Sequence, residues 1–238
     1  DLYVNKIGFI LKGAVKKSLK KIIISLAKNY KLNQKPSFHK MYQDTPNFHR
    51  IIDKNITKKY KIFAIKHSFF FYNWNIRSKL ENKFKDSVYK HWRYIKFLAG
   101  NRKNQYEKNK PLDGQIDRLQ IIRYPSGGGL LKDHVDPTKN QKIVSGLIMS
   151  KIGNDFNNGG FYFKKKNKKK FNIENRLDIG DAVIFYGSII HGVDKVDPKS
   201  KLNWKSDNGR WFIGMFVNDS DHVKNRVVAK DLSYSVNR

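Results

Sequence analysis

The chain has no cysteine among its 238 residues, and this absence limits the chemistry open to it. Disulfide bonds and thiolate metal sites are excluded, so histidine and carboxylate groups must hold any metal. The absence also fits a reducing compartment, and we expect a cytoplasmic protein.

A long hydrophobic run is also missing from the sequence. The densest apolar cluster lies within residues 20–30 and is flanked by lysines, so it is too short to span a bilayer. No signal peptide is visible, but the chain opens on Asp1 rather than Met, so a preceding targeting segment stays open. A hydrophobic content of 39% and an aromatic content of 13% argue against disorder.

Acidic residues are few, with 20 against 49 basic residues and a net charge of +29. Residues 1–116 carry 27 basic and 7 acidic groups, and residues 117–238 carry 22 and 13, so the excess lies on the N-terminal side. Two explanations stay open. The first is drift in base composition, because Lys, Asn and Ile make up 86 of the 238 residues. The second is an anionic partner or substrate.

The first third of the chain reads as helical. Apolar residues recur every three or four positions in residues 14–30 and again in residues 78–99, which predicts two amphipathic helices. The expected buried stripes are Leu19, Ile22, Ile23 and Leu26, and then Leu80, Phe84, Val88, Trp92, Ile95 and Ala99. The aromatic-rich residues 61–74 predict one or two strands, and the polar residues 101–115 predict a connecting loop.

From Asp117 onward, short apolar segments alternate with turn residues. We predict eight strands, at residues 118–124, 130–136, 143–149, 160–163, 171–174, 182–186, 189–193 and 210–217. This spacing is typical of an all-β sandwich or a double-sheet jelly roll. The lysine-rich residues 164–170 are expected to form a solvated hairpin tip, with contact to an anionic partner as the alternative.

The sequence contains one His-x-Asp motif, formed by His134 and Asp136. One such motif arises easily by chance among seven histidines, so its surroundings must decide its meaning. Two residues apart at the end of a predicted strand, both side chains are expected on the barrel interior. His191, at the start of a later predicted strand, is the best-placed third ligand. Two imidazoles and one carboxylate leave three positions of an octahedral ion open, as in the facial triad of non-heme Fe(II) oxygenases.

Such a site also needs a cation for the distal carboxylate of a 2-oxo acid. Arg210 opens the last predicted strand, where its guanidinium can point into the same barrel. An isolated arginine at a strand start is usually a surface residue, so its position alone leaves both readings open.

The combination of motifs is more specific than each motif alone. Residues 120–218 resemble the 2-oxoglutarate/Fe(II)-dependent dioxygenases, and among them the prolyl-4-hydroxylase-like group. The resemblance runs through RYPSGGGLLKDHVDP, NNGGFYF, LDIGDAVIFYGSIIHGV and GRWFIGMFV, in this order. It implies an α+β protein with a mainly β core, a double-stranded β-helix (jelly roll) buttressed by N-terminal helices.

The resemblance also implies roles for individual residues. His134, Asp136 and His191 are expected to bind Fe(II), Arg210 to anchor the C5 carboxylate of 2-oxoglutarate, and Tyr124 to donate a hydrogen bond to it. The implied reaction uses O2 and hydroxylates an unactivated C–H bond, with succinate and CO2 as co-products. A carboxylate at residue 136 favours hydroxylation over halogenation, because halogenases of the superfamily carry a small residue there.

Two features depart from the family pattern. Residues 194–208 read as an inserted loop between His191 and Arg210, and this loop offers Lys201 as a rival anchor. The first 115 residues are barely covered by the resemblance. We therefore expect a mixed, partly helical buttress with substrate loops over 1–115, a catalytic core over 116–220 and a C-terminal extension over 221–238.

The substrate stays open among three classes. The first is a small anion, for example one linked to a sugar or a nucleotide, attracted by the basic surface. The second is a protein, hydroxylated at a prolyl or similar residue. The third makes the chain a basic nucleic-acid-binding module or a demethylase. A demethylase usually carries a second arginine soon after the anchor, and the sequence has none before Arg226, so we expect no nucleic-acid partner. The remaining histidines, expected at surface or structural positions, are His39, His49, His67, His91 and His222.

Overall fold

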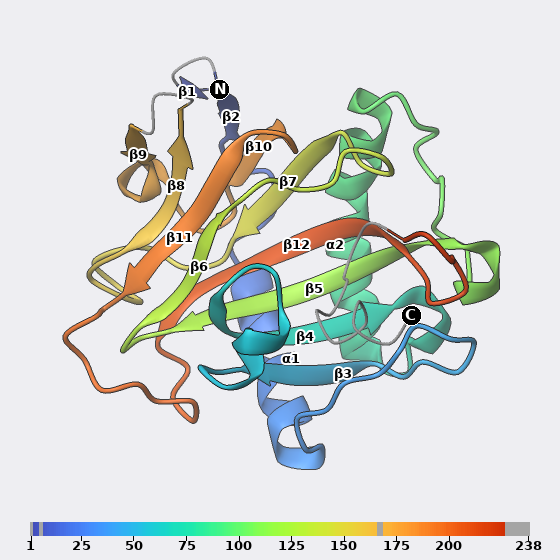
Figure 1. Cartoon of the computed structure of the whole chain (residues 1–238), viewed down its shortest axis with the longest axis horizontal. Helices are drawn as coiled ribbons and strands as arrows, with labels where there is room; N and C mark the ends of the chain where they lie inside the picture. Colours follow the sequence, from blue (N-terminus) through green and yellow to red (C-terminus); the bar gives the residue numbers. More distant parts are fainter. Residues whose placement is uncertain (1, 5–6, 166–168, 227–238) are drawn as a thin grey trace.

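The computed structural model describes residues 2–4, 7–165 and 169–226. Within these ranges most elements are strands (Figure 1). The strands are β1 (Leu2–Val4), β2 (Gly8–Leu11), β3 (Phe48–Ile52), β4 (Ala64–Tyr72), β5 (Gln115–Pro125), β6 (Gly129–His134), β7 (Ile143–Ile148), β8 (Gly160–Lys164), β9 (Lys170–Asn172), β10 (Ala182–Tyr186), β11 (Ile190–Val196) and β12 (Gly209–Asp219). The helices are α1 (Leu19–Asn33) and α2 (Lys79–Leu98), with short 3-10 turns at Ile56–Lys59, Asn73–Asn75, Pro111–Asp113 and Glu174–Arg176.

The strands form an antiparallel ladder that curls over on itself. One half runs in the order β1-β2-β10-β7-β12-β5-β4-β3, and the other in the order β6-β11-β8-β9. Strand β4 joins the halves, because its first residues pair with β6 while the rest of the strand pairs with β5. The two halves enclose an interior, which is the predicted jelly-roll arrangement.

Helices α1 and α2 lie behind the larger half of the ladder, as Figure 1 shows. Helix α2 begins at a capping box, in which Ser78 and Glu81 satisfy each other's backbone N–H groups. Its predicted stripe is confirmed for Phe84, Val88, Trp92 and Ile95, which are buried, whereas Leu80 is only partly buried. The stripe of α1 is likewise confirmed for Leu19, Ile23 and Leu26.

Side chains of β4, β5 and β12, the central strands of the larger half, point alternately toward the helices and toward the interior. One face, packed against the helices, carries Phe69, Phe71, Leu119, Ile121, Trp211, Ile213 and Met215. The opposite face, lining the interior, carries Ser68, Phe70, Tyr72, Gln120, Ile122, Tyr124, Phe212 and Phe216. The aromatic run at 69–72 is therefore split between the core and the interior, because successive side chains of a strand point to opposite faces.

The eight predicted strands are all present, with shifted ends. Strand β6 ends at His134, so Asp136 follows the strand instead of closing it. In the lysine-rich segment, Lys164 pairs with Lys170 across the β8–β9 hairpin, and the tip itself, 166–168, lies outside the described residues. The loop after β11 packs onto the barrel, because Arg123, fully buried, donates hydrogen bonds to the carbonyl oxygens of Asn203 and Ser206.

The helical reading of the first third was incomplete. Strand β2 pairs with β10, and β3 pairs with β4, so this region adds strands to both ends of the larger half. Both strands are too short for a clear period-two pattern, and the partner of β2 is distant in sequence. The division of the chain at residue 115 stays a prediction, as does a C-terminal extension, of which 227–238 lie outside the described residues.

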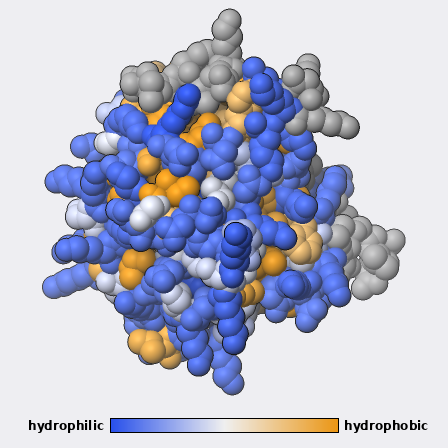
Figure 2. Space-filling model, turned by 90° about the vertical axis from the view of Figure 1, so that its left-hand side faces the viewer, coloured by the Kyte–Doolittle hydropathy of each residue, from blue (hydrophilic) through white to orange (hydrophobic). Residues whose placement is uncertain are grey.

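Figure 2 shows a face on which polar and charged side chains prevail and apolar side chains are exposed in small separate groups. Among the described residues, neither helix combines the length and the hydropathy that a membrane span requires.

Candidate active site

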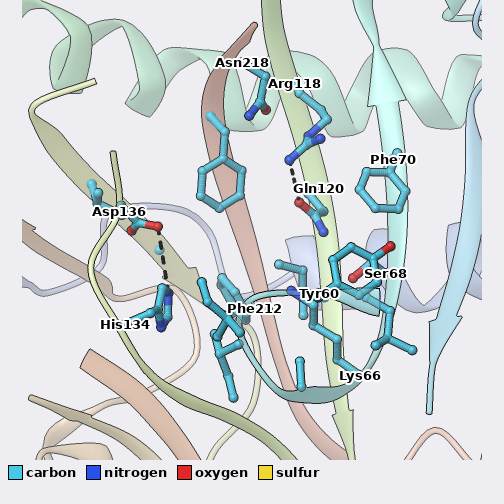
Figure 3. A pocket seen from close by; sticks show the side chains of 18 of the residues that line it. Tyr60, Lys66, Ser68, Phe70, Arg118, Gln120, His134, Asp136, Phe212 and Asn218 are labelled. Carbon is cyan, nitrogen blue, oxygen red and sulfur yellow. Dashed lines mark hydrogen bonds and ion pairs between the residues drawn. The ribbon is translucent and has the colours of Figure 1, made fainter. Parts of the chain in front are cut away.

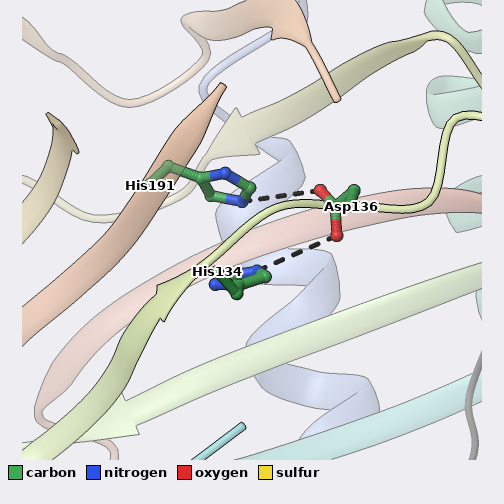
Figure 4. Close-up of side chains that lie close together, drawn as sticks. All are labelled: His134, Asp136 and His191. Carbon is green, nitrogen blue, oxygen red and sulfur yellow. Dashed lines mark ion pairs between the residues drawn. The ribbon is translucent and has the colours of Figure 1, made fainter. Parts of the chain in front are cut away.

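His134, Asp136 and His191 come together in the interior, as predicted. One donor atom from each lies within 4.8 Å of the others, and no other group of three such side chains occurs in the described part of the chain. Nε2 of His191 is 3.4 Å from Oδ2 of Asp136, and Nε2 of His134 is 3.8 Å from Oδ1 (Figure 4). His134 and His191 are direct partners in the pairing of β6 with β11, which places the two rings side by side.

Asp136 reaches the same point from beyond the end of β6. Its backbone N–H donates to the carbonyl oxygen of Gly187 at 2.8 Å, and this bond holds the segment after β6 against the turn before β11. The prediction that His134 and Asp136 share a face is therefore correct, although a loop and not a continuing strand provides the position.

Both imidazoles are oriented by their own backbone. Nδ1 of His134 lies 3.0 Å from the carbonyl oxygen of Lys132, and Nδ1 of His191 lies 2.9 Å from that of Ile189. A carbonyl accepts only, so each Nδ1 must carry the proton and each Nε2 keeps its lone pair. Both lone pairs then belong to the atoms that face Asp136, which is the arrangement of metal-bound histidines.

Burial favours the neutral form of both rings. It lowers the pKa of His134 to about 4, with His191 as a further cause, and that of His191 to about 4. Burial also raises the pKa of the Asp136 carboxyl, although the nearby His134 opposes this. A bound divalent cation would favour the ionised carboxylate and use the two neutral rings, so the donor set fits a metal.

Arg210 is buried in the interior and carries its own counter-ion. The side chain is about as enclosed as any in the core, and its Nε donates to Oε2 of Glu174 at 2.8 Å. The same Oε2 accepts the backbone N–H of Phe161 at 2.6 Å. Arg210 also lines the cavity that contains the three metal-binding candidates. The sequence gives no periodic signal for Glu174, which lies on a 3-10 turn after β9.

Tyr124 stands directly opposite Arg210 in the pairing of β12 with β5. Its ring stacks on Phe212 with centroids 5.9 Å apart, and the side chain lines the same cavity. Burial raises the pKa of the Tyr124 hydroxyl, so at neutral pH this group is a hydrogen-bond donor. Lys201, the rival anchor, is exposed on the loop after β11 and does not line the cavity.

The other histidines lie outside the three-residue group, although His39 lines the cavity. His49 and His67 are buried and hydrogen-bonded to each other, Nδ1 to Nε2, at 2.8 Å. His91 is buried on α2, where Nε2 lies 2.9 Å from Oγ of Ser145. His222 is exposed near the end of the described chain. None of these takes part in the three-residue group.

A cavity of about 770 Å³ connects these groups (Figure 3). It extends from His134 and Asp136 to residues that the sequence did not single out, Lys66 on β4 and Arg118 on β5. The position of Arg118 could have been predicted from the alternation of side chains along a strand. Arg118 lies six residues before Tyr124, an even number, so both side chains face the same side.

Comparison with known proteins supports this fold. No family model and no curated protein matches the sequence. Among solved structures, a prolyl-4-hydroxylase from Pseudomonas putida is similar with a TM-score of 0.54 and 8% identity, over 88% of this chain and 91% of that one. A prolyl hydroxylase from Trichoplax adhaerens, in complex with a hypoxia inducible factor peptide, is similar with a TM-score of 0.53 and 13% identity, over 91% and 86%.

A third similar structure is SnoN, a non-heme alpha-ketoglutarate-dependent epimerase from nogalamycin biosynthesis. It has a TM-score of 0.50 and 8% identity, over 89% of this chain and 77% of that one. The three proteins carry different activities, so what they have in common with this chain is the fold. The chain therefore has the double-stranded β-helix fold of these hydroxylases and this epimerase, as the order of its motifs predicted.

Proposed function

We propose that the protein is an Fe(II)- and 2-oxoglutarate-dependent dioxygenase that hydroxylates an unactivated C–H bond. The observation that carries the proposal is the group of His134, Asp136 and His191, whose donor atoms converge within 4.8 Å on the wall of the cavity. Two neutral imidazoles and one carboxylate are the donor set of the non-heme iron oxygenases. Bound iron, together with 2-oxoglutarate and O2, would supply the oxidising chemistry.

The side chains around this group have separate tasks in the proposal. His134, Asp136 and His191 hold the metal, and the carbonyl oxygens of Lys132 and Ile189 keep the two rings in the required orientation. Retention of a carboxylate at Asp136 favours hydroxylation over halogenation, because a carboxylate occupies the space that a halide would need.

Arg210 and Tyr124 bind the cosubstrate in this proposal. The guanidinium offers a rigid, permanently charged donor to the distal carboxylate, and the Tyr124 hydroxyl adds a neutral donor from the neighbouring strand. Apolar walls such as Phe161, Phe185 and Phe212 keep water from the reacting groups and so strengthen these polar contacts.

The proposed substrate is a small anionic molecule. A cavity of about 770 Å³ has the size of a small-molecule site, and its walls combine aromatic rings with a few cationic groups. The alternative is a protein hydroxylase of the prolyl type, which the names of the Pseudomonas and Trichoplax proteins favour. A nucleic-acid demethylase has no such support. The cytoplasm stays the proposed location, in keeping with the absence of cysteine.

Metal binding and cosubstrate turnover test the proposal directly. Purified protein should bind one Fe(II) and release succinate from 2-oxoglutarate with Fe(II), ascorbate and O2. His134→Ala should lose both properties. Loss of a group that only hydrogen-bonds a metal ligand lowers metal affinity roughly 10- to 100-fold, so loss of the ligand itself should lower the iron affinity by at least that much. Calorimetry and succinate quantification are the measurements.

The matched control is His222→Ala, which removes an exposed histidine outside the site. This variant should bind iron and turn over 2-oxoglutarate like the wild type, while circular dichroism confirms that both variants fold. The proposal is wrong if the wild type binds no iron, or if His134→Ala binds iron as well as His222→Ala does. A screen of anionic metabolites against peptides for stimulated succinate release then separates the two substrate classes.

A further inference from the structure

Two cations lie on the cavity face of β4 and β5. Only Arg118 is remote from the residues assigned to cosubstrate binding, because His67, next to Lys66, pairs with Arg123, next to Tyr124. Lys66 belongs to β4 and Arg118 to β5, and both line the cavity that contains His134 and Asp136. In Figure 3, Arg118 and Ser68 lie on the opposite side of the cavity from these two metal-binding candidates.

Neither cation is ion-paired to a carboxylate in the described part of the chain, although the charge of Asp136 favours the protonated form of Lys66. Burial, aided by the charge of Arg118, lowers the pKa of Lys66 to about 8. Burial also lowers the pKa of Arg118. Both side chains are partly buried. A partly buried charge without an ion-pair partner costs free energy, so the two cations do not stabilise the fold.

Unused hydrogen-bonding atoms surround the two charges. Nε of Arg118 and Oγ of Ser68 are buried and have no hydrogen-bond partner among the described residues. A terminal nitrogen of Arg118 makes a long contact of 3.5 Å to Oε1 of Gln120, and the hydroxyl of Tyr72, opposite Arg118 in the pairing of β4 with β5, also interacts with the guanidinium. These donors, with the Lys66 ammonium, match the several acceptor oxygens of one phosphate or carboxylate group.

Aromatic rings flank the same place. The guanidinium carbon of Arg118 lies 5.2 Å from the ring centroid of Phe70 and 5.9 Å from that of Phe216. Tyr60 and Tyr72 also line this part of the cavity. The body attached to the anionic group would therefore contact apolar, ring-shaped surfaces.

The cosubstrate does not account for Arg118. Arg118 lies six residues from Tyr124 along β5, about 20 Å at the rise of an antiparallel strand, whereas Tyr124 is opposite Arg210. A molecule as short as 2-oxoglutarate, held at Arg210, cannot also occupy the surroundings of Arg118.

We propose that Lys66 and Arg118 bind the anionic group, a phosphate or carboxylate, of a ring-containing small-molecule substrate whose opposite end faces His134, Asp136 and His191. This inference rests on the proposed dioxygenase function, because that function makes the bound molecule a substrate. The anion site itself can be tested without any turnover.

Phenyl phosphate and phenylacetate serve as probes, with phenol as the neutral match. Calorimetric titrations are made anaerobically into protein loaded with Fe(II) and 2-oxoglutarate, and repeated without either. At least one anion should bind the wild type at least 10-fold more tightly than phenol does. The double variant Lys66→Met/Arg118→Met should lose this preference and keep its affinity for 2-oxoglutarate.

The matched control removes two exposed lysines of α2, as Lys83→Met/Lys90→Met, and carries the same change in net charge. It should bind the anions like the wild type. A second readout is thermal unfolding without anion, in which Lys66→Met and Arg118→Met should each raise the Tm, because each removes a partly buried charge that has no ion-pair partner.

Three results would overturn the assignment. The first is a wild type that binds neither anion more tightly than phenol, and the second is a double variant that binds them equally well. The third is loss of 2-oxoglutarate affinity in the double variant, which would make the pair part of the cosubstrate site. If the anions bind as expected but the protein binds no iron, the dioxygenase proposal fails while the anion site stands.

Discussion

Arg210 and Glu174 form an ion pair that is almost completely shielded from solvent. Nε of Arg210 is 2.8 Å from Oε2 of Glu174, and the exposed fractions of the two side chains are 2% and 1%. Because the same oxygen accepts the backbone N–H of Phe161, the carboxylate is attached to β8 while the guanidinium comes from β12. The orientation of Arg210 in the cavity therefore depends on a residue from the opposite half of the barrel.

Glu174→Gln should destabilise the fold at pH 7. The amide oxygen can still accept from Phe161, but Arg210 keeps a buried charge without a counter-ion, which costs about 3–5 kcal/mol of unfolding free energy. Saturating 2-oxoglutarate with a redox-inert metal should stabilise the variant more than the wild type, because its carboxylate supplies the missing charge. Urea unfolding with and without 2-oxoglutarate measures both effects; equal stabilisation of the two proteins would argue against Arg210 as the anchor.

Arg210→Met should weaken cosubstrate binding selectively. Hydrogen bonds to a charged group contribute about 1.5–3 kcal/mol, so the Kd of 2-oxoglutarate should rise roughly 10- to 100-fold. The Kd of the metal should stay within a factor of about two, because Arg210 contacts none of the three metal-binding candidates. Calorimetry with metal and then with 2-oxoglutarate separates the two constants. A parallel loss of both would mean that the substitution disturbs the barrel as a whole.

Gly160→Ala should displace Glu174 and thereby Arg210. Gly160 has a φ of +108°, and a Cβ atom there would lie 2.5 Å from Cγ of Glu174. We expect a loss of unfolding free energy greater than the roughly 1–2 kcal/mol of backbone strain alone, together with weaker 2-oxoglutarate binding. Gly153→Ala is the matched control, since its φ of +87° is similarly strained but its Cβ would meet nothing within 4 Å. If the two variants behave identically, the proposal that Glu174 positions Arg210 is wrong.

His91 should make stability depend on pH. Burial lowers the pKa of His91 to about 4, whereas an unfolded histidine titrates near 6.5, so the unfolded chain binds the extra proton between these values. Stability from this residue is therefore present above pH 6.5 and is lost as the pH falls toward 4. Between pH 7 and pH 5 the wild type should lose about 2 kcal/mol more unfolding free energy than His91→Gln. Parallel pH profiles from chemical denaturation would contradict this.

The sequence was sufficient for features that repeat locally or that depend on one strand end. Period-two segments located the eight strands from residue 117 onward, and the stripe of α2 located its buried face. His134, Asp136 and His191 could be grouped because a jelly roll brings the ends of these strands together.

Features that depend on pairing between distant segments could not be predicted. Strand β2 forms because β10 offers it an edge, and nothing in its four residues indicates this partner. Glu174 follows β9 on a single turn, so no pattern shows that it faces Arg210. Lys66 reads as one lysine among many until β4 is known to turn that face inward.

The alternation of β4, β5 and β12 has a consequence for how this protein can change. Apart from Val217, residues that line the cavity and residues that contact the helices occupy separate positions of the same strands. Substitutions at 66, 68, 70, 118 or 120 can therefore alter which molecules are accepted while the helix-facing core stays intact. Insertion of a single residue in β5 would instead exchange the two sets and damage recognition and folding together. Point substitutions on the cavity face can therefore change substrate specificity without loss of stability, whereas a change in strand length would lower both stability and binding.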